Sequence, residues 1–226
     1  MQNIESKWKF LLPECEKKSN FKKKKLKKFL PFFSYVFHPI FIPILGTFFY
    51  VLISDTYFSS TQYIILFSQI FIVTFLLPIA FFYLLRTFGK VDGIMLSDIS
   101  QRRIPLILQM ALFSTLVTRS ITADLFPGLH HFFLGGLIST SIAFLLLFVK
   151  VTASIHMIGM SALTMFLIGL SYHNQVNIIN TIIFFLVMNG FVASSRLEMK
   201  AHTPKELLYG FICGSIPQIL LFNFWL

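Results

Sequence analysis

The sequence has few acidic side chains and only two cysteines. Asp and Glu together number 9 among 226 residues, and charged residues of both signs make up 12%. With 56% apolar residues and a mean hydropathy of +0.77, this composition excludes an ordinary soluble domain. Cys15 and Cys213 are too far apart in sequence and setting to indicate a disulfide framework or a zinc site. Most of the chain is therefore expected to lie in lipid.

The sequence also lacks the alternating segments of about ten residues that are typical of membrane β-barrel strands. Long unbroken apolar runs are present instead, and these predict helices because a bilayer offers no water to the backbone. About 20 apolar residues cross a bilayer, which predicts an all-α transmembrane bundle of six or seven spans. The expected spans are residues 31–54, 63–85, 105–121, 132–149, 155–172, 178–194 and 207–226.

Two of these spans have distinct features. The first contains Pro39 and Pro43, and we expect it to be kinked because a proline removes a helical donor and crowds the preceding turn. The third contains Gln109 and Arg119, so it is the least apolar and could instead be a short or partly immersed helix. The difference between six and seven spans depends on this segment.

The net charge of +10 comes mainly from the N-terminus, where residues 7–28 contain ten of the nineteen basic side chains. A lysine cluster directly before a span is typical of an orientation signal and of contact with anionic lipid headgroups, rather than nucleic acid. We therefore divide the chain into a basic cytoplasmic tail, residues 1–30, and a single transmembrane domain, residues 31–226. The expected location is the cell (inner) membrane, with several spans and a cytoplasmic N-terminus.

The basic residues of the loops agree with that orientation. Among the loops expected on the opposite side, only Arg119 is basic. The positive-inside rule therefore places the other loops on the cytoplasmic side with the tail. The basic residues of these cytoplasmic loops are Arg86, Lys90, Arg102, Arg103, Lys150, Arg196, Lys200 and Lys205.

Three loops on the tail's side hold nearly all the remaining ionisable groups. They are residues 97–105, residues 150–156 and residues 195–206. Two spans separate each loop from the next, so helical hairpins can bring the three loops together. We expect them to form one cationic pocket that contains histidine, at a membrane surface.

The third of these loops resembles the signature of the type 2 phosphatidic acid phosphatase (PAP2) superfamily. Ser195 and Arg196 are followed after five residues by His202 and after three more by Glu206, where the family usually has Asp. In the second loop, residues 153–156 are similar to the family's Pro-Ser-Gly-His element, with Ala and Ile in place of Pro and Gly. In the first, residues 102–105 are similar to the end of its Lys-x6-Arg-Pro element, without the lysine. The resemblance covers residues 97–214 and predicts a PAP2-like core.

The resemblance implies a metal-independent phosphatase without a cofactor. By this resemblance, His202 would attack phosphorus and form a phosphohistidine, and Glu206 would orient its ring. His156 would protonate the leaving group and then activate water, a task suited to a group that titrates near neutrality. The expected substrate is a lipid phosphate or a polyprenyl diphosphate.

The same resemblance implies a binding site for the phosphoryl oxygens. Arg196, with Arg102 or Arg103, would hold them through charge-assisted hydrogen bonds. Ser154, together with the backbone amides at the start of the following helix, would assist.

Several alternatives stay open at this point. Thr203, Pro204 and Glu206 also form a helix-capping pattern, and this role can coexist with catalysis. The chain could be a catalytically inactive PAP2-like protein that binds lipid phosphates, or a small transporter. The other histidines fit no metal-ligand spacing, so no metal site is expected. They are His38, His130, His131 and His173.

Overall fold

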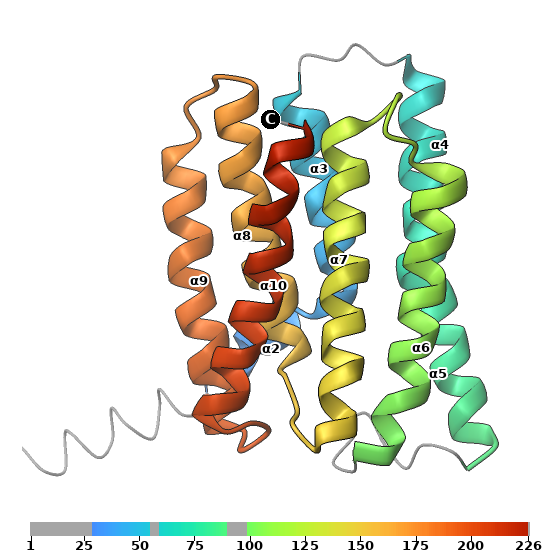
Figure 1. Cartoon of the computed structure of the whole chain (residues 1–226), viewed down its shortest axis with the longest axis vertical. Helices are drawn as coiled ribbons and strands as arrows, with labels where there is room; N and C mark the ends of the chain where they lie inside the picture. Colours follow the sequence, from blue (N-terminus) through green and yellow to red (C-terminus); the bar gives the residue numbers. More distant parts are fainter. Residues whose placement is uncertain (1–28, 55–58, 90–98, 226) are drawn as a thin grey trace, which may run out of the picture.

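The structure is a computed structural model of the chain, and it describes residues 29–54, 59–89 and 99–225. Within these ranges all the regular secondary structure is helical, and the long helices stand side by side in a bundle (Figure 1). The prediction of an all-α bundle is confirmed for this part of the chain. The basic tail, apart from residues 29 and 30, lies outside the described residues, as do Lys90 and residues 97–98 of the first loop.

The helices follow one another in a simple order along the chain. They are α2 (Pro31–Val36), η1 (Pro39–Phe41), α3 (Ile42–Ile53), α4 (Ser60–Phe71), η2 (Ile72–Leu76), α5 (Leu77–Thr87), α6 (Ile99–Thr115), η3 (Leu116–Ser120), α7 (Pro127–Leu146), η4 (Leu147–Val149), α8 (Ile155–His173), α9 (Ile179–Glu198) and α10 (Pro204–Trp225). The segments η2 and η3 are π-helical turns, whereas η1 and η4 are 3-10 turns.

Within the described ranges, six helical segments are long and apolar enough to cross a membrane. They are Pro31–Ile53, Ser60–Thr87, Pro127–Val149, Ile155–His173, Ile179–Glu198 and Pro204–Trp225. The chain is thus a multi-pass membrane protein, and the secondary structure of its described part is helical.

The third predicted span behaves differently from the other six. Helix α6 continues into η3 and lies beside α5 and α7 (Figure 1). It is not among the six apolar segments, which agrees with its content of Gln109 and Arg119. Helix α6 begins at Ile99, before the start of the predicted span, and includes Pro105.

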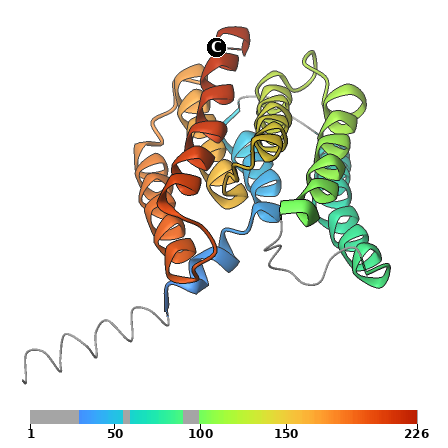
Figure 2. The same cartoon turned by 60° about the horizontal axis from the view of Figure 1, so that its bottom comes forward.

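The kink predicted in the first span is confirmed. Helix α2 ends at Val36, and His38 has an extended backbone with φ −66° and ψ 140°. Pro39 then opens η1, whose amide at Ile40 donates a hydrogen bond to His38 Nδ1 over 3.3 Å. This break turns α2 under the bundle toward α9 (Figure 2).

The three polar loops lie at one end of the bundle. The start of α6, the α7–α8 connection and the α9–α10 connection are all at the end where α2 lies (Figure 1). Lys150 and Lys200, in the second and third connections, have the left-handed backbone angles φ 58° and φ 51°. In both turns the next amide donates to the carbonyl five positions earlier. Thr152 and His202 each follow two residues after such a lysine.

Helix α8 is the most buried of the six apolar segments, and its most extensive contact is with α10. Two glycines on α10 permit this close approach. A methyl group on Gly210 would lie 2.6 Å from the Ser154 carbonyl oxygen. A methyl group on Gly214 would collide with the Ile158 carbonyl and the Ser161 side chain. The close contact between α8 and α10 therefore requires glycine at positions 210 and 214 of α10.

We expect Gly214→Ala to lower the free energy of unfolding by about 1–3 kcal/mol, because the added methyl group forces α10 away from α8. Gly190→Ala on α9 is the matched control, since nothing lies within 4 Å of a methyl group there. The measurement is thermal unfolding in detergent. Equal unfolding temperatures for the two variants would contradict the requirement for a close α8–α10 contact.

Candidate active site

Glu206 forms the capping box that the sequence predicts at the start of α10. Its Oε2 atom accepts hydrogen bonds from the Thr203 amide at 2.7 Å and from the Thr203 hydroxyl at 3.2 Å. In return, the Glu206 amide donates to Thr203 Oγ1 over 3.4 Å. The carboxylate is therefore held at the first turn of the helix, where the helix dipole also favours a negative charge.

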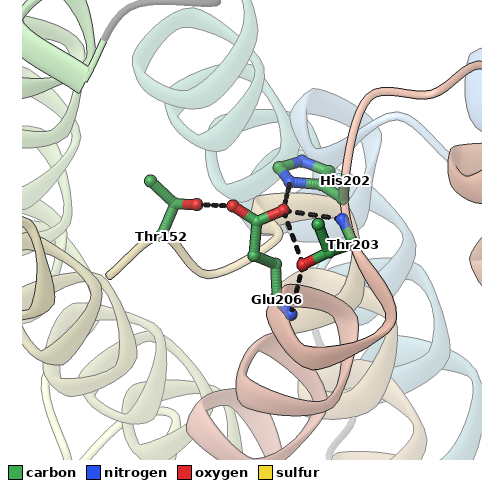
Figure 3. A network of polar contacts seen from close by, with 4 residues as sticks. All are labelled: Thr152, His202, Thr203 and Glu206. Atoms are coloured by element: carbon green, nitrogen blue, oxygen red, sulfur yellow. Dashed lines mark hydrogen bonds and ion pairs between the residues drawn. The ribbon is translucent and has the colours of Figure 1, made fainter. Parts of the chain in front are cut away.

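The same carboxylate joins the second and third loops (Figure 3). Its Oε1 atom accepts a hydrogen bond from Thr152, and its Oε2 atom lies 3.5 Å from His202 Nδ1. This last contact has the length of an ion pair but not the geometry of a hydrogen bond. The backbone adds a further link, because the Ser154 amide donates to the Glu206 carbonyl over 3.1 Å. Glu206 thus positions His202 against the start of α8.

His202 is in a cationic and largely buried environment. Its side chain is 7% exposed. Its pKa is lowered to about 4, chiefly by burial and then by the positive charges of Arg196 and Arg102, while Glu206 acts in the opposite direction. The ring is therefore neutral at pH 7. With Nδ1 directed at Glu206, the favoured tautomer carries its proton on Nδ1 and leaves the Nε2 lone pair available.

Two arginines from different helices approach this histidine. Arg196 is in the last turn of α9, and Arg102 is near the start of α6. Both are half-buried, and the Arg196 Nε atom is buried without a hydrogen-bond partner among the described residues. A buried guanidinium donor is costly without an acceptor, and an anion is a strong acceptor for it. The cluster is therefore suited to a phosphate group.

The structure separates the two neighbouring arginines of α6. Arg102 acts electrostatically on both His202 and Glu206. Arg103 is exposed, and its guanidinium lies over the Phe148 ring at 5.6 Å from the ring centre. Of the two alternatives from the sequence, Arg102 is the one placed in the cluster.

His156 lies in the first turn of α8 and is anchored by α2. Its Nε2 atom is 3.2 Å from the Ser34 carbonyl oxygen, so Nε2 is the protonated nitrogen in the neutral ring. The Ser34 hydroxyl is 2.6 Å from the Ser195 hydroxyl of α9, which fixes α2 against the site. The His38 ring packs edge-on against His156, with ring centres 5.1 Å apart. The charges of Arg196 and His202 also act on His156, and its Nδ1 atom is left to exchange a proton.

Ser154 is fully buried at the N-cap of α8, but it differs from the expectation in one respect. Its amide is already bonded to the Glu206 carbonyl, so this donor is not available to a phosphate. Its hydroxyl oxygen is buried and has no hydrogen-bond partner among the described residues. If Ser154 contributes to binding a phosphate, it therefore does so through its hydroxyl group and not through its amide.

Sequence reasoning missed three residues of this cluster, namely Thr152, Ser34 and His38, and it named Ser195 in the third motif without giving it a role. His38 carried a usable signal, because an ionisable residue before a proline inside an apolar run is a functional candidate by default. Thr152 and Ser34 carried no signal, since small hydroxyl residues are common at such positions. Within the described residues, no group of three or more His, Cys, Asp or Glu side chains is placed to hold a metal ion.

We expect Arg102→Gln to raise the pKa of His202 above its value of about 4, because a nearby positive charge is removed. At pH 5 the ring is then more often protonated and reacts more slowly with diethyl pyrocarbonate. The measurement is the pH dependence of modification at His202, followed by mass spectrometry. Arg103→Gln is the matched control and should leave the midpoint unchanged; an equal midpoint in both variants would show that Arg102 does not act on this histidine.

Comparison with known proteins gives no match to a family model, to a curated protein or to a solved structure. The PAP2 resemblance therefore depends on the three short motifs alone and stays a prediction. Independently of it, the structure brings residues of all three motifs to one end of the bundle. These are Arg102, Ser154, His156, Arg196, His202 and Glu206.

Proposed function

We propose that this chain is an integral membrane phosphatase that hydrolyses a lipid phosphate or a polyprenyl diphosphate through a phosphohistidine. The observation that carries the proposal is the environment of His202. Its Nδ1 atom faces Glu206, its pKa is lowered to about 4, and two arginines act on it from α6 and α9. A neutral, oriented imidazole beside two cationic side chains is what nucleophilic attack on a phosphate requires.

In the first step, the Nε2 lone pair of His202 attacks phosphorus, and the bond between phosphorus and the leaving oxygen breaks. The imidazole then carries a positive charge, which Glu206 stabilises through Nδ1. The substrate binds as a monoanion and passes its proton to Nδ1 of His156, which hands that proton to the leaving oxygen and returns to the neutral ring. In the second step, Nδ1 of His156 accepts a proton from water, the hydroxide attacks the phosphohistidine, and His202 leaves as a neutral ring with its proton on Nδ1. His156 then returns its extra proton to the departing phosphate.

Arg196 and Arg102 would hold the non-bridging oxygens and stabilise the charge that they gain in the transition state. In the part of the chain that the structure describes, the Arg196 Nε atom and the Ser154 hydroxyl have no hydrogen-bond partner, which supports this role. The Ser34 carbonyl, which accepts from His156 Nε2, would fix the tautomer of the acid and base.

One observation favours a second candidate, a PAP2-like protein that binds lipid phosphates without turnover. The Ser154 amide is bonded to Glu206, and the contact between His202 and Glu206 is 3.5 Å without hydrogen-bond geometry. A binder would need the arginines but not an aligned nucleophile. Turnover separates the two candidates.

We expect vanadate-sensitive release of phosphate from a lipid phosphate or a polyprenyl diphosphate by the purified protein. Arg102→Gln should reduce kcat by about 100-fold or more, because it removes a donor to the transition state. The neighbouring Arg103→Gln is the matched control and should retain activity, since its guanidinium lies over Phe148. Rapid quenching should trap an acid-labile phosphoryl group on wild-type protein that is absent from His202→Ala.

The outcomes of this assay separate the candidates. Release that survives His202→Ala contradicts the phosphohistidine mechanism. Binding of lipid phosphate without release from any of these substrates supports the binder. Uptake of substrate that depends on an ion gradient supports a transporter.

We propose further that the site faces the cytoplasm from the inner membrane. The positive-inside rule supports this orientation, because the basic loops lie at the end of the bundle where α2 follows the lysine-rich tail. A cysteine in place of the exposed Lys200, in a variant with Cys15→Ser and Cys213→Ala, should not react with an impermeant maleimide added to intact cells. Asn177→Cys, at the opposite end of the bundle, is the control that should react. Reaction at position 200 would reverse the proposed orientation.

A further inference from the structure

A cavity of about 220 Å³ lies inside the bundle, next to the cationic cluster. It is bounded by η1 and α3, by the π-helical turn η2 with α5, and by the inner faces of α6, α7 and α8. Four prolines line it at positions where helices begin or bend. They are Pro39, Pro43, Pro78 and Pro105.

The cavity and the cluster share a boundary. His38 and Ile155 line the cavity; the His38 ring packs on His156, and Ile155 precedes that histidine in α8. Helix α6 also connects the two regions along one face. Arg102 acts on His202, and Leu106, Gln109 and Phe113 follow at helical spacing and line the cavity. A ligand with its phosphate at the arginines would therefore have its remaining part directed into the cavity.

The lining of the cavity is suited to hydrocarbon. Its two threonines use their hydroxyl groups within their own helices: Thr74 donates to the Ile70 carbonyl at 2.8 Å, and Thr140 donates to the Gly136 carbonyl at 2.7 Å. Their methyl groups are then left for packing. The lining residues that the structure describes include no Asp, Glu, Lys or Arg, so a phosphate would find no lysine or arginine there.

We propose that this cavity binds one hydrocarbon chain of the phosphorylated lipid whose phosphate lies at His202, Arg196 and Arg102. The identity of the headgroup rests on the proposed function, whereas the chain site rests on the cavity itself. Pockets for drug-sized ligands are typically about 300–1,000 Å³, and this cavity is smaller. It therefore accepts one chain, and the site selects single-chain phosphates over glycerolipids with two chains. His38 is at the neck between headgroup and chain.

The proposal is tested with alkyl phosphonates, which carry the anionic headgroup but are not hydrolysed. Affinity should rise about fourfold for each added methylene until the chain fills the cavity, and then level off. A phosphonate with a diazirine near the end of its chain should label residues that line the cavity. Phe113, Phe132 and Thr140 are the expected positions, mapped by mass spectrometry.

Cavity-filling variants provide the second measurement. Ala162→Leu places a larger side chain in the cavity from α8 and should reduce labelling at least tenfold. Ala111→Leu makes the same change at an exposed position of α6 and should leave labelling unchanged. Ala143→Val fills the cavity from α7 with a smaller change and should also reduce labelling. Thermal unfolding of each variant verifies that it is folded.

The failure of this proposal is distinct from the failure of the proposed function. Labelling of lipid-facing residues alone, or equal labelling of Ala162→Leu and Ala111→Leu, overturns the chain site even if phosphate is released. Labelling of the cavity without phosphate release from any lipid leaves the chain site in place and overturns the phosphatase. Equal affinity for single-chain and two-chain phosphonates overturns the selectivity.

Discussion

Gly210 and Gly214 remove the side chains that would otherwise separate α10 from α8, and the candidate site depends on this contact. With the two helices close together, the Glu206 carbonyl reaches the Ser154 amide and the carboxylate reaches Thr152. A wider spacing would leave the second and third loops side by side but unconnected. Packing in the membrane-spanning part of the bundle thus determines the geometry of polar groups at its end.

Glu206 combines two roles: its carboxylate caps α10, and it also faces the candidate nucleophile His202. The capping box satisfies backbone donors at the start of α10, and it does so with the carboxylate that faces His202. The cap fixes the position of the carboxylate before any substrate binds. An orienting group that is already held by the fold has little freedom left to lose during a reaction.

Local patterns predicted those parts of the fold that depend on one segment alone. The apolar runs, the break near His38 and the capping box at Glu206 all follow from nearest neighbours in the sequence. Tertiary packing decided the rest. Which of Arg102 and Arg103 enters the cluster depends on the face that α6 presents to its neighbours, and His38 meets His156 only because the kinked first span folds under α8. No spacing rule contains that information.

Two lysines with left-handed backbone conformation show that the backbone can restrict which residues are tolerated at an exposed, charged position. Lys150 and Lys200 have positive φ. Glycine and asparagine adopt this backbone conformation readily, whereas β-branched residues are strained in it. Among homologous chains, substitution at these two positions should therefore follow backbone tolerance, with glycine or asparagine admitted and valine or isoleucine excluded. At these two surface positions the backbone conformation of the turn, rather than the charge, would then limit the residue type. Each of the two turns places the residue two positions later, Thr152 or His202.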